Sequence, residues 1–305
     1  MQRDTIKTIN IPSIARCHEL MGFEKPRHPL FSIMRFEDLK RARNEARVKL
    51  IFDYYQIVLK IDCPGKLQYG QTKYDFDEGV MSFFAPRQVN ILEPGEVLAK
   101  SGWLLSVHPD FLLKSSLGTK INNYGFWSYR VNEALIISEE EQESLGNIFK
   151  AIEKEYRQPI DSFSRDVVIA NIELLLTYSN RYYERQFIVR QPYHDGFVEQ
   201  FHNLLNQYWD QEVATAGLPS VKYFADKLCI SNNYLSDLLR QMTGQNAQQH
   251  IHTKLIEKAK ERLMTTSLSV NEIAYELGFE YPQSFSKLFK AKTSHSPVEF
   301  RKMFN

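Results

Sequence analysis

The chain has 305 residues, of which 43% are hydrophobic and 25% are charged, and its formal net charge is +1. This composition is typical of a soluble globular protein, and the length favours two domains joined by connecting helices. No stretch approaches the run of about 20 apolar residues that a membrane-spanning helix needs. The near-zero net charge of the chain as a whole gives no indication of nucleic-acid binding.

Cysteine usage and the start of the chain indicate a cellular compartment. The three cysteines, Cys17, Cys63 and Cys229, are odd in number and widely scattered, which predicts reduced thiols. The segment from Met1 to Asp4 lacks the apolar core of a secretory signal peptide. We therefore expect a cytoplasmic protein.

The first part of the chain is expected to be rich in β-strands. Pro12, Pro26 and Pro29 predict an extended or partly ordered arm over residues 1–30. Residues 49–61 are rich in aromatic and β-branched side chains and predict one long strand. Turn-forming pairs follow at short intervals up to residue 95, and such spacing is typical of a β-sandwich or barrel.

Two helices are predicted next. Residues 138–156 open with a capping box, Ser138 and Glu141, and continue with apolar residues on one face. Residues 161–187 carry a long apolar stripe at three- and four-residue steps. Such a stripe either packs on the β-domain or pairs with a second subunit, and the sequence leaves both alternatives open. Residues 188–196 are expected to be an interdomain linker, because Pro192 and Gly196 break regular structure.

Residues 218–305 contain one small unit twice. The first set of positions recurs 49 residues later: Val221, Phe224, Ala225 and Leu228 correspond to Val270, Ile273, Ala274 and Leu277. The second set recurs 50 residues later: Leu235, Leu238, Leu239 and Arg240 correspond to Phe285, Leu288, Phe289 and Lys290. The change of offset falls in a turn between two helices. The repeat therefore predicts two helix-turn-helix units.

Capping and turn residues support this prediction. Ser220 and Ser231 can cap the two helices of the first copy, and Ser269 with Glu272 has the spacing of a capping box in the second. Gly278 suits a helix end, and Pro282 suits a first helical turn. Residues 246–264 predict a connecting helix about 28 Å long, close to the repeat of about 34 Å in duplex DNA.

The second helix of each copy leaves a polar outer face. In chain order these faces carry Asn232, Asn233, Ser236, Asp237 and Arg240, and then Gln283, Ser284, Ser286, Lys287 and Lys290. Amides and lysines can read base edges, while hydroxyls and cations can hold phosphates. A polar helix face is often only solvated, but its duplication in two such motifs favours DNA contact. Asp237 is discordant, because phosphate repels a carboxylate, so Lys287 is expected to contribute more to affinity.

These residues resemble the DNA-binding domain of AraC/XylS-type transcriptional regulators. The matching positions are Ile273-Ala274 with Leu277-Gly278-Phe279, Ser284-Phe285-Ser286 with Phe289-Lys290, and Ser296-Pro297 with Phe300-Arg301. The resemblance covers roughly 100 residues at fixed spacing. Two positions depart from it: Ser294 stands where the family usually has glycine, and Asp237 stands where a basic residue is common.

Residues 74–86 resemble part of the cupin-like barrel found at the amino end of many such regulators. Enzymatic cupins bind iron or manganese through closely spaced histidines, but His108 is the one histidine of this barrel region, so we expect neither metal nor cofactor. The resemblance implies an effector pocket inside the barrel, for which the candidates are Tyr55, Phe83, Arg87, Trp103 and Phe111. Ordinary core packing is the favoured alternative for the four aromatic residues.

The sequence thus predicts an α+β protein. Residues 1–135 would form a cupin-like sensing barrel, residues 136–190 a helical connector able to dimerise, and residues 191–305 an all-α domain with two helix-turn-helix units. The expected function is sequence-specific transcription regulation, controlled by a small effector or a partner. The expected partners are double-stranded DNA, RNA polymerase for an activator, and a second copy, with no membrane. The alternatives are a cupin-type metal-dependent enzyme with a helical appendage and a ligand-free architectural DNA binder.

Overall fold

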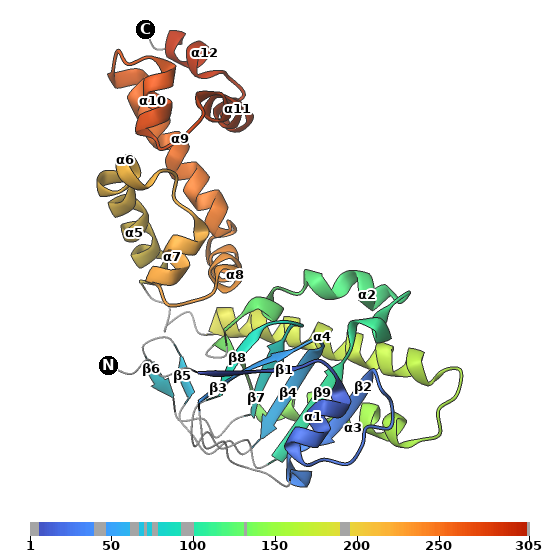
Figure 1. The fold of residues 1–305 in the computed structure, drawn as a ribbon. Helices are drawn as coiled ribbons and strands as arrows, with labels where there is room; N and C mark the ends of the chain where they lie inside the picture. Colours follow the sequence, from blue (N-terminus) through green and yellow to red (C-terminus); the bar gives the residue numbers. More distant parts are fainter. Residues whose placement is uncertain are drawn as a thin grey trace. The chain divides into compact units, whose positions relative to one another are not determined.

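The computed structural model describes residues 6–39, 47–61, 67–69, 72–74, 79–92, 101–130, 133–189 and 196–303. The chain divides into two compact units, Met1–Gln186 and Phe187–Asn305 (Figure 1). In the described residues the first unit combines sheets with helices and the second contains helices alone, which confirms the predicted α+β class.

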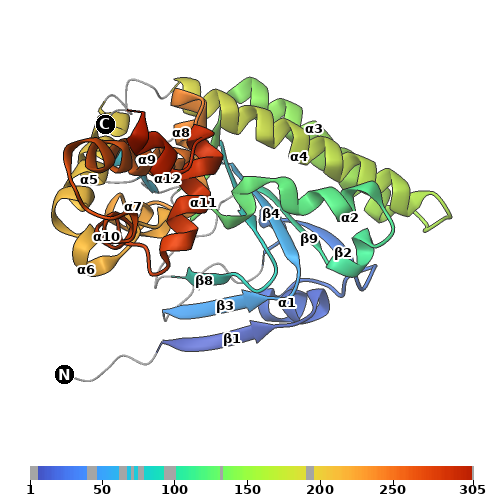
Figure 2. The same ribbon diagram turned by 90° about the horizontal axis from the view of Figure 1, so that it is seen from above.

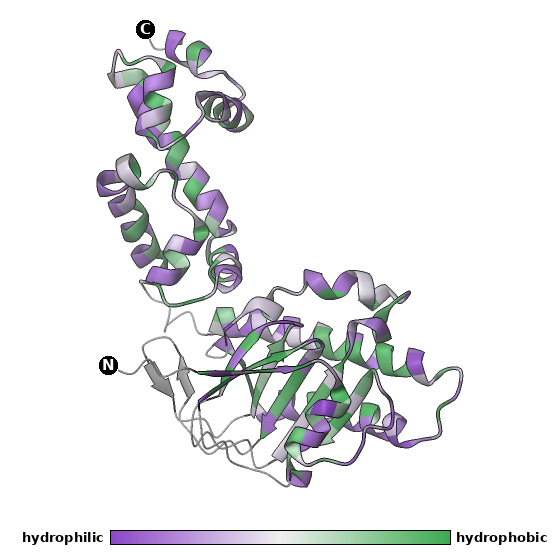
Figure 3. Cartoon of the chain, in the orientation of Figure 1, coloured by the Kyte–Doolittle hydropathy of each residue, from purple (hydrophilic) through white to green (hydrophobic). Residues whose placement is uncertain are grey.

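The first unit is built around a five-stranded antiparallel sheet. Its strand order is β10 (Leu135–Ile137), β7 (Gly79–Phe84), β4 (Tyr55–Ile61), β9 (Ser101–Val107) and β2 (Phe31–Arg35). The register places Ile57 opposite both Phe83 and Leu105, so these side chains share one face of the sheet. Figure 3 shows the hydrophobic residues concentrated on these strands.

A second sheet shows that the prediction for residues 1–30 was wrong. β1 (Lys7–Ile11) pairs in parallel with β3 (Val48–Phe52), which in turn pairs with β8 (Val89–Leu92). α1 (Ile14–Met21) follows, capped by the Ser13 hydroxyl, and buries Ile14 and Cys17 in a core cluster. The prolines lie between these elements rather than preventing them. A small hairpin joins β5 (Leu67–Tyr69) to β6 (Thr72–Tyr74).

The single strand predicted for residues 49–61 is instead two strands in different sheets. β3 ends at Phe52 and β4 begins at Tyr55, with a bend at Asp53 and Tyr54. Tyr54 is fully buried and its ring lies 5.5 Å from that of Phe52, so burial of this aromatic pair holds the bend. Several of the turn-forming pairs expected before residue 95 lie outside the described residues.

Two long helices cover one face of the five-stranded sheet (Figure 2). They are α3 (Glu139–Arg157) and α4 (Ser164–Val189), and the predicted Ser138–Glu141 capping box opens α3. Trp103 of β9 stacks on Phe149 of α3, and Phe83 of β7 contacts Tyr183 of α4. The opposite face of the sheet packs Met34, Val58 and Leu104 against Met21 and Phe23 near the end of α1.

Short helical segments complete the described part of the first unit. They are η1 (Phe36–Asp38), η2 (Pro109–Leu112), α2 (Ser116–Lys120), η3 (Ile121–Asn123) and η4 (Gly125–Ser128). Residues 136–186 of the predicted connector belong to this unit. α4 continues to Val189, and most of the predicted linker, residues 190–195, lies outside the described residues.

A buried carboxylate ties α3 to the edge of the sheet. Glu153 is 7% exposed and accepts hydrogen bonds from Arg35 at 2.7 Å, Arg157 at 2.6 Å and the Trp103 indole at 3.3 Å. Burial raises the pKa of Glu153, but the hydrogen bonds from Arg35 and Trp103, with the charges of both arginines, outweigh it and hold the pKa below its ordinary value. The carboxylate is therefore charged and fully engaged at neutral pH.

The second unit consists of eight helices in the described residues. They are α5 (Phe197–Gln211), α6 (Val213–Ala216), α7 (Val221–Lys227), α8 (Asn232–Thr243), α9 (Ala247–Thr265), α10 (Val270–Glu276), α11 (Pro282–Thr293) and α12 (Pro297–Lys302). The predicted connecting helix is α9, whose N-cap is Asn246. Across all of the described residues, no helix is long and apolar enough to cross a membrane.

Candidate nucleic-acid interface

α7 and α8 form the first helix-turn-helix, with the predicted capping residues in place. The Ser220 hydroxyl accepts from the Tyr223 amide, and the Ser231 hydroxyl accepts from the Tyr234 amide. Cys229 turns the chain in the left-handed region at φ 59°, and the Ile230 amide then donates to Ala225 at 2.9 Å. These bonds fix the angle at which α8 leaves the turn.

α10 and α11 repeat this geometry. The Ser269–Glu272 capping box is formed, and its hydrogen bonds from the Ser269 hydroxyl and amide hold the pKa of Glu272 below its ordinary value. Gly278 turns the chain at φ 86°, and the Phe279 amide donates to Ala274 at 3.0 Å, the counterpart of the Ile230 bond. Pro282 is the first residue of α11, as predicted.

α9 holds the two motifs together. Its 19 residues span about 28 Å, and its buried face consists of Ile251, Leu255, Ile256, Ala259 and Leu263, with Ala247 at its start. Figure 1 shows α8 near one end of α9 and α11 near the other, both on the same side of that helix. The two second helices are therefore presented together to one side of the unit.

The ten residues predicted to contact DNA all lie on the outer faces of α8 and α11. Seven are exposed and three are half-buried; the exposed ones are Asn232, Asn233, Arg240, Gln283, Ser284, Lys287 and Lys290, and the others are Ser236, Asp237 and Ser286. Leu235, Leu239, Phe285 and Phe289 are fully buried on the inner faces. The polar residues are thus brought together on each helix as the sequence predicted, and their contact with DNA stays a prediction.

The two helices differ in charge. On α8, the Arg240 guanidinium lies 3.0 Å from the Asp237 carboxylate, so the acid and the base of this helix pair with one another. α11 carries Lys287, Lys290 and Lys292 and no acidic residue. All three lysines are exposed. The positive charge of this surface is therefore concentrated on α11.

Two further residues of this surface were missed from the sequence. Lys292 lies on the last turn of α11, and its charge helps to lower the pKa of His252 on α9, after the larger effect of burial. Tyr281 precedes α11 and is 68% exposed. The run of three lysines could have indicated Lys292, whereas the exposure of Tyr281 is visible only in the fold.

Of the five candidate effector residues, Tyr55, Phe83 and Trp103 share one face of the five-stranded sheet, whereas Arg87 and Phe111 lie in a turn and in η2. Tyr55 donates to Asn122 at 3.2 Å and its ring contacts Trp127 at 4.8 Å. Phe83 and Trp103 pack against the helices described above. Arg87 is at a turn with its side chain 86% exposed, 3.8 Å from Asp53. The structure does not gather the five around one cavity, and an effector pocket made of them stays a prediction.

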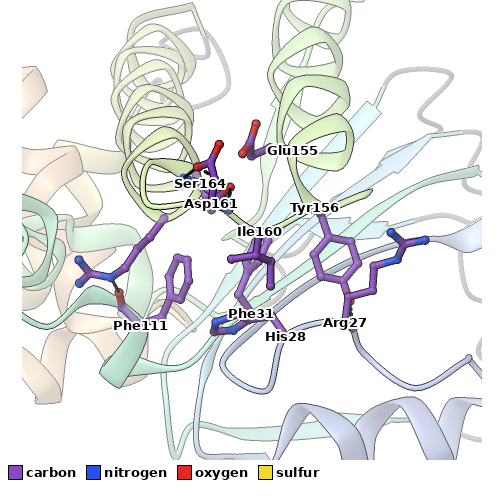
Figure 4. A pocket seen from close by; sticks show the side chains of 11 residues that line it. Arg27, His28, Phe31, Phe111, Glu155, Tyr156, Ile160, Asp161 and Ser164 are labelled. Atoms are coloured by element: carbon purple, nitrogen blue, oxygen red, sulfur yellow. Dashed lines mark hydrogen bonds between the residues drawn. The ribbon is translucent and has the colours of Figure 1, made fainter. Parts of the chain in front are cut away.

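Phe111 lines a different cavity, of about 70 Å³, near the ends of α3 and α4 (Figure 4). Its floor is aromatic: Phe31 stacks on Phe111 at 5.3 Å and meets Tyr156 at 5.3 Å. The arginines that line this cavity already donate to backbone carbonyls, Arg27 to that of Arg157 and Arg165 to that of Phe111. These charged groups thus hold the surrounding loops in place. No group of three or more potential metal ligands occurs in the described parts of the chain.

The chain is similar to known proteins, and the matched family model lies within the second unit. Residues 224–303 match a family model described as a helix-turn-helix domain. The uncharacterized HTH-type transcriptional regulator YfiF of Bacillus subtilis is 25% identical over 169 residues, covering 52% of this chain and 50% of that protein. The uncharacterized transcriptional regulatory protein YesN of Bacillus subtilis is 38% identical over 86 residues, covering 27% of this chain and 23% of that protein. The chain thus spans half or less of the length of these relatives.

A solved structure is also similar to part of the chain. It is the C-terminal domain of the two-component response regulator yesN from Fusobacterium nucleatum, 29% identical, covering 34% of this chain and 95% of that chain with a TM-score of 0.31. The family model and the sequence relatives agree with the duplicated motif geometry. The carboxy-terminal part of the chain is a double helix-turn-helix domain of the AraC/XylS type.

Proposed function

We propose that this protein is a sequence-specific DNA-binding transcription regulator. The observation that carries the proposal is the pair of recognition helices, α8 and α11, which expose amides, hydroxyls and cations on one side of α9. Such side chains supply the donors and acceptors that read base edges and hold phosphates.

The proposed binding mode places α8 and α11 in successive major grooves on one face of the duplex. The length of α9, about 28 Å, approaches the helical repeat of about 34 Å, so a modest tilt or bend would seat both helices. α11 would supply most of the phosphate attraction, because its three lysines face no acid on their own helix.

We assign the first unit a regulatory role. A small effector or a protein partner that prefers one placement of the units would shift the population between states of different DNA affinity or polymerase contact. Dimerisation through α4 is part of this proposal. Val167 and Leu174 of α4, and Phe163 just before it, leave apolar surface outside the packed core, at 41%, 45% and 70% exposure, which supports pairing with a second copy.

Lys287→Ala tests the DNA-binding mode. Loss of one base or phosphate contact should weaken binding to a selected site by about 1–3 kcal/mol, and a lost phosphate contact should also lower the salt slope by about one. The measurement is a fluorescence titration with duplex DNA at several salt concentrations. Lys150→Ala on α3 is the matched control, since it removes the same charge from the other unit. Equal affinities for both variants and the unchanged protein would contradict the placement of α11.

A further inference from the structure

The recognition helices of the two motifs can be compared position by position. α8 and α11 each have 12 residues and begin 50 positions apart, at Asn232 and Pro282. Their buried anchors also correspond at this offset, since Leu235 matches Phe285 and Leu239 matches Phe289, all fully buried. The outward faces are therefore in the same helical register, and equivalent residues meet equivalent positions in a groove.

Three of the outward positions are chemically alike in the two helices. Asn233 corresponds to Gln283, and both are exposed amides near the helix N-terminus, which is the part of a recognition helix that reaches base edges. An amide side chain pairs with the N6 and N7 atoms of adenine through two hydrogen bonds. Ser236 corresponds to Ser286, and Arg240 corresponds to Lys290.

A fourth outward position carries opposite charges in the two helices. Asp237 of α8 corresponds to Lys287 of α11. A carboxylate only accepts hydrogen bonds, and the base group that suits it in the major groove is the N4 amino group of cytosine. A lysine only donates, and it suits O6 and N7 of guanine.

The ion pair on α8 makes the aspartate compatible with DNA. Arg240 lies 3.0 Å from one carboxylate oxygen and offsets the charge that phosphate would repel. A carboxylate offers about four lone-pair sites, so one that already accepts hydrogen bonds can also accept one from an amino group. Asp237 keeps 27% of its side chain exposed, enough for a base edge to reach it.

We propose that the DNA site has two unequal blocks, one read by α8 and one by α11. Each block contains an adenine, read by Asn233 or by Gln283. At the next equivalent position the α8 block has a cytosine that contacts Asp237, and the α11 block has a guanine that contacts Lys287. This inference rests on the proposed function and specifies its target. The block under α11 contributes more to affinity and to salt dependence, because α8 has no net charge and α11 carries three lysines.

The test is a binding-site selection from random duplex DNA with the full-length chain and with a charge-exchange variant, Asp237→Lys combined with Lys287→Asp. The unchanged protein should enrich two blocks that differ as cytosine against guanine at the equivalent position. The variant should exchange these bases between the blocks. Asp237→Asn, which preserves shape, should reduce discrimination for cytosine by about tenfold or more, and circular dichroism would establish that each variant is folded.

The outcomes separate this inference from the function on which it rests. Two blocks with the same base at this position, or a motif that the charge exchange leaves unaltered, would overturn the inference while the regulator function stands. An Asp237→Asn variant with undiminished cytosine preference would also overturn it. If the unchanged protein enriches no sequence, the proposed function fails and the inference fails with it.

Discussion

Gly278, in the turn of the second helix-turn-helix, lies against the segment that joins α6 to α7. Its φ is 86°, and a Cβ added there would lie 2.6 Å from the carbonyl carbon of Gly217 and 2.8 Å from the amide nitrogen of Leu218. Gly278→Ala therefore combines a left-handed backbone with a backbone clash and should destabilise the second unit by about 2–3 kcal/mol. Urea unfolding followed by circular dichroism measures this loss.

Gly244→Ala is the matched control at the residue scale. Gly244 has a similar φ of 76°, but an added Cβ there would meet nothing within 4 Å. The free energy of unfolding of that variant should fall by only about 1 kcal/mol, which is the cost of the left-handed conformation for alanine. If the two variants lose the same free energy, close contact between Gly217 and Gly278 does not contribute to stability.

At the scale of the element, chain-local chemistry made the helices of the second unit predictable. Ser231 and Ser269 cap helices through hydrogen bonds spanning three residues, so sequence spacing alone determines them. The bend at Tyr54 could not be predicted in this way, because it depends on a core shared with α1, which is distant in sequence. The neighbours of the five effector candidates could not be predicted for the same reason, because strand pairing and helix packing decide them.

A histidine pair joins three elements of the second unit and should make its stability depend on pH. His250 of α9 lies 3.3 Å from His202 of α5 and 2.7 Å from the Thr243 hydroxyl at the end of α8. Burial lowers the pKa of His250, and the charge of His202 lowers it further. The unfolded chain then binds the proton more readily, so stability is complete above about pH 6.5 and falls as the pH drops through the unfolded value.

His250→Phe tests this pH dependence, because the second motif has Phe300 at the corresponding position, packed on Phe289. The variant should keep the fold, and its Tm should fall less between pH 7.5 and pH 5 than the Tm of the unchanged protein. Thermal unfolding at several pH values measures this dependence. The Tm difference between the two proteins at pH 8, where His250 is neutral, gives the effect of packing alone. An identical decline in the variant would exclude His250 as its source.

At the scale of the whole molecule, the division into two units predicts two unfolding events. Each unit has its own buried core, and Glu153 with its arginines lies entirely in the first while Gly278 lies entirely in the second. Glu153→Gln should cost about 1–2 kcal/mol, since the Arg35 and Arg157 side chains are 38% and 62% exposed and solvent can replace part of the lost bonding.

Calorimetry of the full chain should therefore resolve two transitions with different responses. Glu153→Gln should lower only the transition of the first unit, by about 5 °C, and Gly278→Ala should lower only that of the second. A single transition displaced by both variants would mean that the units unfold cooperatively. DNA containing the selected site should raise the second transition, because a ligand stabilises the unit that binds it. Any shift of the first transition by DNA would reveal the coupling that regulation requires.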